Sequence, residues 1–181
     1  MTQLTEITTL GGGCFWCLEA IFQQVQGVKR VIPGYAGGHS PNPDYKSVCS
    51  GTTGHAEVVQ ISFDPTAISF SGLLYIFWRF HDPTTLNRQG ADIGTQYRSI
   101  ILYQDDKQQS LARDLKKETD ESDLWDNTIV TEIEPLKEFF EAEQYHHNYY
   151  INNPNQPYCS VIIDPKVEKL KKSFNATDLM I

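Results

Sequence analysis

The chain contains no long hydrophobic run. Its longest uninterrupted apolar stretch covers residues 73–78, whereas a membrane-spanning helix requires about 20 such residues. Residues 1–7 lack a basic region followed by an apolar one, so we expect no signal peptide. Basic residues are also scarce, because 15 Lys and Arg against 23 Asp and Glu give a formal net charge of −8. This charge argues against nucleic acid or a membrane as a partner, and an acidic surface is typical of an ordinary cytosolic protein. We therefore expect a cytoplasmic location.

Internal repeats, low-complexity segments and long linkers are absent as well. Their absence, together with a length of 181 residues and 40% hydrophobic residues, predicts one globular domain that covers residues 1–181. Residues 151–181 begin rich in Pro and Asn and continue rich in Lys. We expect a loop-rich C-terminal tail there.

Apolar periodicity predicts an alternation of strands and helices. In chain order we expect strands at 5–10, 28–36, 57–63, 97–103 and 128–134. We expect helices at 14–25, in the segment that ends at residue 80, in the segment that follows a capping residue at 105 or 106, and at 139–150. A β-α-β-β-α-β run indicates an α+β sandwich with helices packed on a mostly antiparallel sheet. The polar loop at 37–53 is unusually long, which is typical of a functional loop.

The four cysteines are Cys14, Cys17, Cys49 and Cys159. Without an export signal we expect no permanent disulfide, so these thiols are reduced, metal-bound or redox-active. Cys14 follows the glycine run 11–13 at the junction of a strand and a helix. The free N–H groups and positive dipole of a first helical turn favour the thiolate, which is the nucleophilic form. The alternative is a buried structural cysteine in a glycine turn.

Cys14 and Cys17 form a C-x-x-C motif. In a reducing compartment this motif predicts a redox pair, and it is also half of a zinc site. The chain has no second C-x-x-C or H-x₃₋₅-H spacing, so zinc is the weaker interpretation. Cys49 lies in a polar loop with no neighbouring base, and we interpret it as a bystander.

Glu57 is in phase with the apolar positions of its predicted strand, which include Val59 and Ile61. A carboxyl group on a core-facing position has its pKa raised by desolvation, which makes Glu57 a candidate general acid. The alternative is a strand-end carboxylate that reaches solvent.

Asp92 and Tyr97 flank a loop that enters a strand, where functional side chains are common. Taken alone, however, Asp92 is more typical of a turn and Tyr97 of a packed aromatic side chain in a strand. His146 and His147 on the last predicted helix indicate surface or hydrogen-bonding residues more than metal ligands.

Four sequence motifs together resemble those of the type A peptide methionine sulfoxide reductases. They are GCFW at 13–16, GTTGHAE at 51–57, DIGTQYRS at 92–99 and YH at 145–146, in one order along residues 7–172. The resemblance implies a ferredoxin-like two-layer α+β sandwich with a C-terminal extension. It implies reduction of methionine-S-sulfoxide, free or in proteins, with thioredoxin as the reductant. It also implies that neither a metal nor an organic cofactor is bound.

The same resemblance assigns roles to single residues. Cys14 resembles the nucleophile that attacks the sulfoxide sulfur, and Glu57 resembles the acid that protonates the sulfoxide oxygen. Tyr45 and Tyr97 resemble hydrogen-bond donors to that oxygen, and Asp92 resembles a residue that supports their network. The chemistry requires such groups, because attack at sulfur builds negative charge on oxygen.

Phe15 and Trp16 resemble the apolar walls that hold the substrate methyl group. Many members of the family carry Gly at the position of Cys17 and resolve the sulfenic acid with a C-terminal cysteine. Here Cys17 and Cys159 are both available. We expect Cys17 to act first, although a helix must distort to bring the two sulfurs of C-x-x-C into disulfide geometry. Cys159 is expected in a flexible segment that can swing in.

Two other functions are compatible with the thiols alone. A C-x-x-C thiol-disulfide exchange enzyme would use Cys14 and Cys17 but gives no role to Glu57, Tyr45 or Tyr97. A non-catalytic zinc-binding module is the other alternative, and stoichiometric zinc in the purified protein would support it.

Overall fold

The computed structural model describes residues 4–174. The strands are β1 (Glu6–Gly11), β2 (Val28–Ala36), β3 (Ala56–Phe63), β4 (Arg88–Gln89), β5 (Asp92–Ile93), β6 (Ile100–Tyr103), β7 (Glu132–Pro135) and β8 (Phe139–Glu141). The α-helices are α1 (Phe15–Phe22), α2 (Tyr45–Cys49), α3 (Phe70–Phe80), α4 (Asp106–Asp120), α5 (Tyr149–Asn152) and α6 (Asp164–Ser173). Two 3₁₀ turns, Thr95–Tyr97 and Gln144–His146, and a π-helical turn, Cys159–Ile163, complete the set.

Six strands form one sheet in the order β7-β6-β1-β3-β2-β8. Every neighbouring pair is antiparallel except β6 and β7. The short strands β4 and β5 form a separate hairpin. The predicted α+β class with a mostly antiparallel sheet is therefore confirmed.

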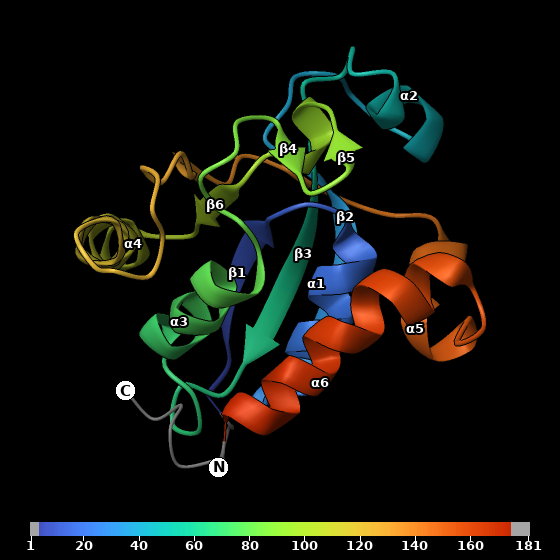
Figure 1. The fold of residues 1–181 in the computed structure, drawn as a ribbon. Helices are drawn as coiled ribbons and strands as arrows, with labels where there is room; N and C mark the ends of the chain where they lie inside the picture. Colours follow the sequence, from blue (N-terminus) through green and yellow to red (C-terminus); the bar gives the residue numbers. More distant parts are fainter. Residues whose placement is uncertain (1–3, 175–181) are drawn as a thin grey trace.

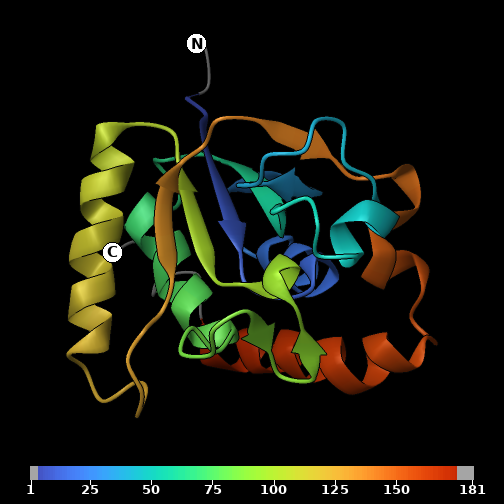
Figure 2. The same ribbon diagram turned by 90° about the horizontal axis from the view of Figure 1, so that it is seen from above.

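The helices α1, α3 and α6 lie along one face of the sheet (Figures 1 and 2). The end of the sheet where β1 runs into α1 faces the β4–β5 hairpin and the start of α6 (Figure 1). Three parts of the chain that are distant in sequence thus meet at the N-terminus of α1. No helix within residues 4–174 is long and apolar enough to cross a membrane.

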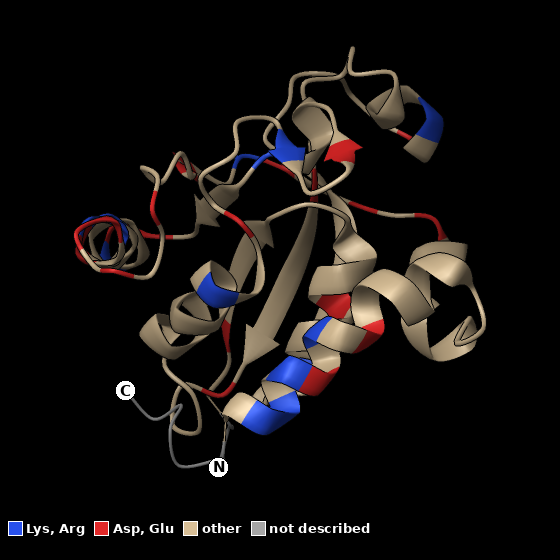
Figure 3. Cartoon of the chain, in the orientation of Figure 1, with Lys and Arg blue, Asp and Glu red and all other residues tan. Residues whose placement is uncertain are grey.

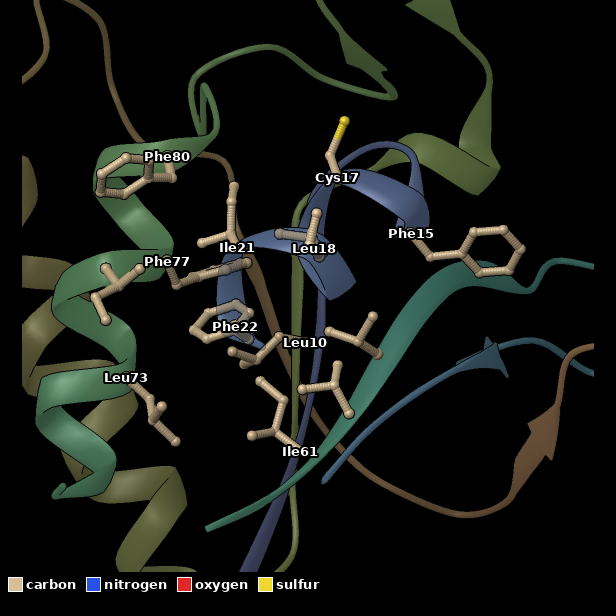
Figure 4. Packing of buried hydrophobic residues seen from close by; sticks show 14 of the residues in the cluster. Leu10, Phe15, Cys17, Leu18, Ile21, Phe22, Ile61, Leu73, Phe77 and Phe80 are labelled. Atoms are coloured by element: carbon tan, nitrogen blue, oxygen red, sulfur yellow. The ribbon is translucent and has the colours of Figure 1, made fainter. Parts of the chain in front are cut away.

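The main core fills the space between the sheet and these helices. Figure 4 shows residues of α1 and α3 packed over the strands, among them Leu18, Phe22 and Phe77. The α1 helix is buried on almost every side, because it lies between the sheet and the C-terminal segment. In Figure 4 the Cys17 sulfur points away from this apolar packing. The site therefore forms on the outer side of a rigidly packed helix.

Two predicted elements are wrong. Residues 139–150 do not form one helix, because Phe139–Glu141 pairs with β2 and the backbone of Asn148 is left-handed, with φ 53°. Gly34 of β2 permits this pairing, since a Cβ there would lie 2.4 Å from the Phe139 ring.

The tail predicted as loop-rich at 151–181 instead contains the π-helical turn and α6. Ile163, Val167 and Leu170 recur at helical spacing and are buried, an apolar stripe that the Pro, Asn and Lys content of the segment obscures. Residues 175–181 of that prediction lie outside the described residues.

Candidate active site

A glycine turn carries the chain from β1 into α1 and presents Cys14. Gly13 has a φ of 96°, which favours glycine, and a Cβ on Gly12 would lie 2.9 Å from the ring of His81. Cys14 is the residue that precedes α1, with an extended backbone, and its carbonyl accepts the Cys17 N–H at 3.1 Å. Its side chain is 8% exposed. The turn thus positions a nearly buried thiol at the positive end of the helix.

Burial, however, reverses the expected ionisation of this thiol. Desolvation raises the pKa of Cys14 well above its ordinary value, and the neighbouring Cys17 and Glu57 raise it further. The Trp16 N–H lowers the pKa of Cys14, as a helix N-terminus should, but by less than burial raises it. Burial of Cys14 thus opposes the ionisation that the start of a helix favours.

Cys17 carries the ionisation that the sequence predicts for Cys14. A hydrogen bond with Cys14 lowers the pKa of Cys17 to about 7, against the opposing effect of burial. Lys166 and the Tyr158 hydroxyl, 3.8 Å from the Cys17 sulfur, lower it further. Lys166 belongs to α6, where lysines gather (Figure 3). Of the two thiols, Cys17 therefore ionises more readily.

Glu57 lies where the alternation of β3 predicts, on the helix-covered face of the sheet. It is 1% exposed, and one carboxyl oxygen accepts the Phe15 N–H at 3.1 Å. Burial raises the pKa of Glu57 to about 8, and the charges of Asp92 and Cys17 add to this effect. The Glu57 carboxyl thus holds its proton near neutral pH. It is hydrogen-bonded to Phe15, the residue directly after Cys14.

Tyr45, Tyr97 and Asp92 surround this carboxyl from three different segments. Tyr45 begins α2 and Tyr97 ends the 3₁₀ turn before β6, and each is half-buried. Burial raises the pKa of both phenols, and the charge of Glu57 raises it further. Both are therefore neutral hydrogen-bond donors.

Asp92, on the β4–β5 hairpin, makes a contact that the sequence analysis missed. One Asp92 carboxyl oxygen accepts the Tyr158 hydroxyl at 2.7 Å, and this is the hydroxyl that lies near the Cys17 sulfur. Tyr158 thus connects the hairpin to the cysteine pair. Its position directly before Cys159 is the one sequence signal that points to it.

Trp16 forms an aromatic wall beside the cysteines. Its ring stacks on Tyr149, with centroids 3.7 Å apart and planes 5° apart, and its N–H donates to His146 Nδ1 at 3.0 Å. Phe15 is completely buried against Tyr35 and His146. The wall offers an apolar surface of the kind that holds a methyl group.

The comparisons with known proteins agree with this geometry. Residues 6–178 match the family model described as peptide methionine sulfoxide reductase. The chain belongs to this family. It is 54% identical over 169 residues to the peptide methionine sulfoxide reductase MsrA of Saccharolobus solfataricus, covering 93% of this chain and 94% of that protein.

Two solved structures of the family extend the comparison. Reduced Mxr1 from Saccharomyces cerevisiae superposes with a TM-score of 0.81 and 38% identity, covering 88% of this chain and 91% of that one. Mxr1 in complex with Trx2 superposes with a TM-score of 0.59 and 28% identity, covering 81% of this chain and 86% of that one.

In this member of the sulfoxide reductase family, the other two cysteines lie in unexpected surroundings. Cys159 is 0% exposed and occupies the π-helical turn, so the expected flexible segment is wrong. The apolar spacing of α6 locks the segment into the core. Cys49 is exposed at the end of α2, where it interacts with the Tyr45 hydroxyl through a hydrogen bond. It therefore lies at the edge of the site.

His146 is also more deeply placed than a surface histidine. It is 0% exposed, and burial lowers its pKa to about 4, so the ring is neutral. Among the described residues, no group of three or more His, Cys, Asp or Glu side chains has an arrangement that could hold a metal ion.

Proposed function

We propose that this protein reduces methionine-S-sulfoxide, free or in proteins, to methionine, and that thioredoxin returns it to the dithiol state. The observation that carries the proposal is the cysteine pair at the start of α1 beside a protonated carboxyl, Glu57. Family membership supplies the substrate, and the geometry supports the division of roles below.

Cys14 is the proposed nucleophile. Its sulfur attacks the sulfoxide sulfur while its proton passes to the hydrogen-bonded Cys17, which has the lower pKa of the pair and is therefore the one present as thiolate. Glu57 donates its proton to the sulfoxide oxygen, which gives an intermediate whose substrate sulfur is bonded to both the hydroxyl and Cys14. The hydroxyl then passes to the Cys14 sulfur, and the substrate sulfur keeps the electron pair as its bonds to oxygen and to Cys14 break. The products are methionine and a Cys14 sulfenic acid, which carries the substrate oxygen. Proton transfer to a leaving oxygen is the role that a carboxyl of raised pKa performs well.

Tyr45 and Tyr97 are the proposed donors to the developing negative charge on oxygen. Both phenols stay protonated next to Glu57, so each retains a hydrogen to donate. Asp92 supports this network through its hydrogen bond from Tyr158. A thiol-disulfide exchange enzyme would have no use for these groups.

Trp16 and Phe15 are the proposed walls for the substrate methyl group. The stacking of Trp16 on Tyr149 and the burial of Phe15 hold both rings in fixed orientations. A fixed aromatic pocket distinguishes the methyl side of a sulfoxide from its oxygen side, and this supports selectivity for one epimer.

Cys17 is the proposed first resolver. Its thiol attacks the Cys14 sulfenic acid, a disulfide forms, and the oxygen leaves as water. Cys159, which is fully buried in the π-helical turn, is the alternative resolver. Thioredoxin then reduces the disulfide through a mixed disulfide. The complex of Mxr1 with Trx2 supports thioredoxin as the partner.

The architecture behind this site is proposed to be ferredoxin-like. The antiparallel order β6-β1-β3-β2, with α1 and α3 as the connecting helices, supports a β-α-β-β-α-β core. Residues 1–181 are proposed to form a single catalytic domain, since α6 shares the hydrophobic core of α1. The location is proposed to be cytoplasmic, because the proposed cycle needs reduced cysteines, the state that a reducing compartment maintains.

An assay resolved by epimer tests the function. With dithiothreitol as the reductant, we expect the protein to convert methionine-S-sulfoxide to methionine and to leave the R epimer unchanged. Comparable turnover of both epimers would contradict the selectivity, and turnover of neither would refute the proposed function.

A further inference from the structure

The wall residue Trp16 is held by two residues of one tight turn. His146, which accepts the Trp16 N–H, lies two residues before Asn148, and the stacked Tyr149 follows it. Asn148 has a φ of 53°, a conformation that costs energy for any residue other than glycine. Whatever holds this turn in place therefore holds Trp16 as well.

A carboxyl group from α1 lies against the backbone of the turn. Glu19 is 1% exposed, and its Oε1 accepts the Asn148 N–H at 2.9 Å. The N–H of Tyr149 also stabilises the charge of this carboxyl. Glu19 follows Trp16 by three residues, so both side chains leave the same face of α1. One face of one helix thus presents the aromatic ring and the group that fixes its support.

Burial of the Glu19 carboxyl costs free energy, and the hydrogen bond to the turn offsets part of that cost. Burial raises the pKa of Glu19, and Lys29, Arg30 and Glu141 line the same cavity as Glu19. The second oxygen of Glu19, Oε2, has no hydrogen-bond partner. An apolar side chain would suit a helix that is buried on almost every side. The Glu19 carboxyl therefore stabilises the backbone of the turn.

The turn also contacts segments other than α1, because the His147 ring lies 3.0 Å from the Ala142 carbonyl and the Asn152 N–H donates to the Asn148 carbonyl at 2.9 Å. An open cavity of about 390 Å³ lies beside the turn, and Glu19, His147 and Asn148 help to line it. Gln23, directly after α1, donates from Nε2 to Asn148 Oδ1 at 2.7 Å, and this hydrogen bond is exposed to solvent. The backbone N–H of Asn148, by contrast, is held by the buried Glu19 carboxyl.

We propose that Glu19 is a positioning residue, which fixes the 146–149 turn through its backbone N–H groups and so sets the orientation of Trp16 in the substrate pocket. The effect on substrate rests on the proposed role of Trp16 as a wall for the methyl group. The effect on the Trp16 ring itself does not depend on any activity.

Three variants test this inference: Glu19→Ala, Glu19→Gln and the control Gln23→Ala. Glu19→Ala removes the acceptor of the Asn148 N–H and frees the turn, so KM for methionine-S-sulfoxide should rise about tenfold while kcat stays within about twofold. Glu19→Gln keeps an acceptor oxygen and places its amide where Oε2 makes no hydrogen bond, so it should restore the parent KM. Gln23→Ala removes an exposed contact to the same turn and should change neither constant.

The fluorescence of Trp16 gives a second measurement that needs no turnover. The emission of each variant minus that of its Trp16→Phe derivative isolates this ring, which should shift to longer wavelength in Glu19→Ala alone. If Glu19→Ala does not fold, Glu19→Asp, which is too short to reach Asn148, takes its place with the same expectations.

Parent values of KM and Trp16 emission in the folded Ala or Asp variant would overturn the proposal. An equal change in Gln23→Ala would also overturn it. A protein that reduces no sulfoxide but shows the Trp16 shift would refute the proposed function and leave the positioning role of Glu19 intact.

Discussion

The backbone N–H of Phe15 donates a hydrogen bond of 3.1 Å to the Glu57 carboxyl. Phe15 directly follows Cys14, and Glu57 lies near the start of β3, so this bond ties the acid to the residue beside the nucleophile. The distance between the attacking sulfur and the proton donor is therefore set by the backbone of α1 and not by a flexible side chain. This arrangement makes the proton of Glu57 the most direct property of the site to test.

Glu57→Gln should reduce turnover by about 10²–10⁴-fold, the usual range for loss of a general acid. The amide keeps an oxygen that can accept the Phe15 N–H, so the fold and the titration of the cysteines should change little. Turnover of methionine-S-sulfoxide with dithiothreitol measures the effect. Glu134→Gln, on an exposed carboxyl of β7, is the matched control. A rate close to that of the parent would leave Glu57 as a structural strand residue.

The pH profile of kcat/KM should be bell-shaped. Turnover needs the Glu57 proton, so the rate should fall as pH rises through the Glu57 pKa of about 8. The Cys17 thiolate speeds the attack by accepting the Cys14 proton without being indispensable to it, so the rate should rise through the Cys17 pKa of about 7. In Glu57→Gln the residual activity should lack the alkaline decline. A decline that survives in this variant would assign the alkaline limb to another group.

Stability should depend on pH through the same carboxyl. The pKa of Glu57 rises from an ordinary 4.5 to about 8 in the folded state, so the native protein binds this proton more tightly than the unfolded chain. The contribution is complete below the unfolded pKa and is lost as pH rises through the folded pKa. Between about pH 5 and about pH 9, the parent should therefore lose more thermal stability than Glu57→Gln does. Parallel melting curves across this range would contradict the raised pKa.

Cys14→Ser should abolish sulfoxide reduction, because no other thiol occupies the turn before α1 within reach of the Glu57 proton. Cys49→Ser is the control, since it removes an exposed thiol at the edge of the site. Mass spectrometry of the folded variants with sulfoxide and dithiothreitol measures methionine formed. Substantial activity in Cys14→Ser would remove Cys14 from the role of nucleophile.

The sequence predicted those parts of the site that depend on local periodicity. Alternation along one strand was enough to place Glu57 on the buried face of β3, and a glycine run before an apolar stripe was enough to place Cys14 at a helix start. Both positions depend on neighbours within a few residues.

The missed features depend on contacts between distant segments. The hydrogen bond between Tyr158 and Asp92 joins residues 66 positions apart, and the burial of His146 follows from its contact with Trp16, 130 positions away. The pKa of Cys14 also depends on distant contacts. A helix N-terminus is visible in the sequence, but the desolvation that outweighs it comes from the whole fold around the thiol.

The geometry favours Cys17 as the cysteine that resolves the Cys14 sulfenic acid. Its sulfur is hydrogen-bonded with Cys14 in the resting state, whereas Cys159 is fully buried in the π-helical turn and interacts electrostatically with Cys17. After one equivalent of sulfoxide and no reductant, peptide mapping should find a Cys14–Cys17 disulfide. With dithiothreitol, which reduces a sulfenic acid directly, neither Cys17→Ser nor Cys159→Ser should stop turnover.

With thioredoxin as the reductant, the resolver becomes necessary, because thioredoxin attacks a disulfide. Cys17→Ser should then stop after one turnover with Cys14 as the sulfenic acid, unless the π-helical turn opens and Cys159 reaches it. Cys159→Ser should retain the first disulfide, so any loss of rate in this variant reports a later transfer from Cys17. A Cys14–Cys159 disulfide in the parent after one turnover would reverse the order proposed here. A disulfide to Cys49 would contradict both orders, because it would bring α2 and its exposed thiol into the resolving step.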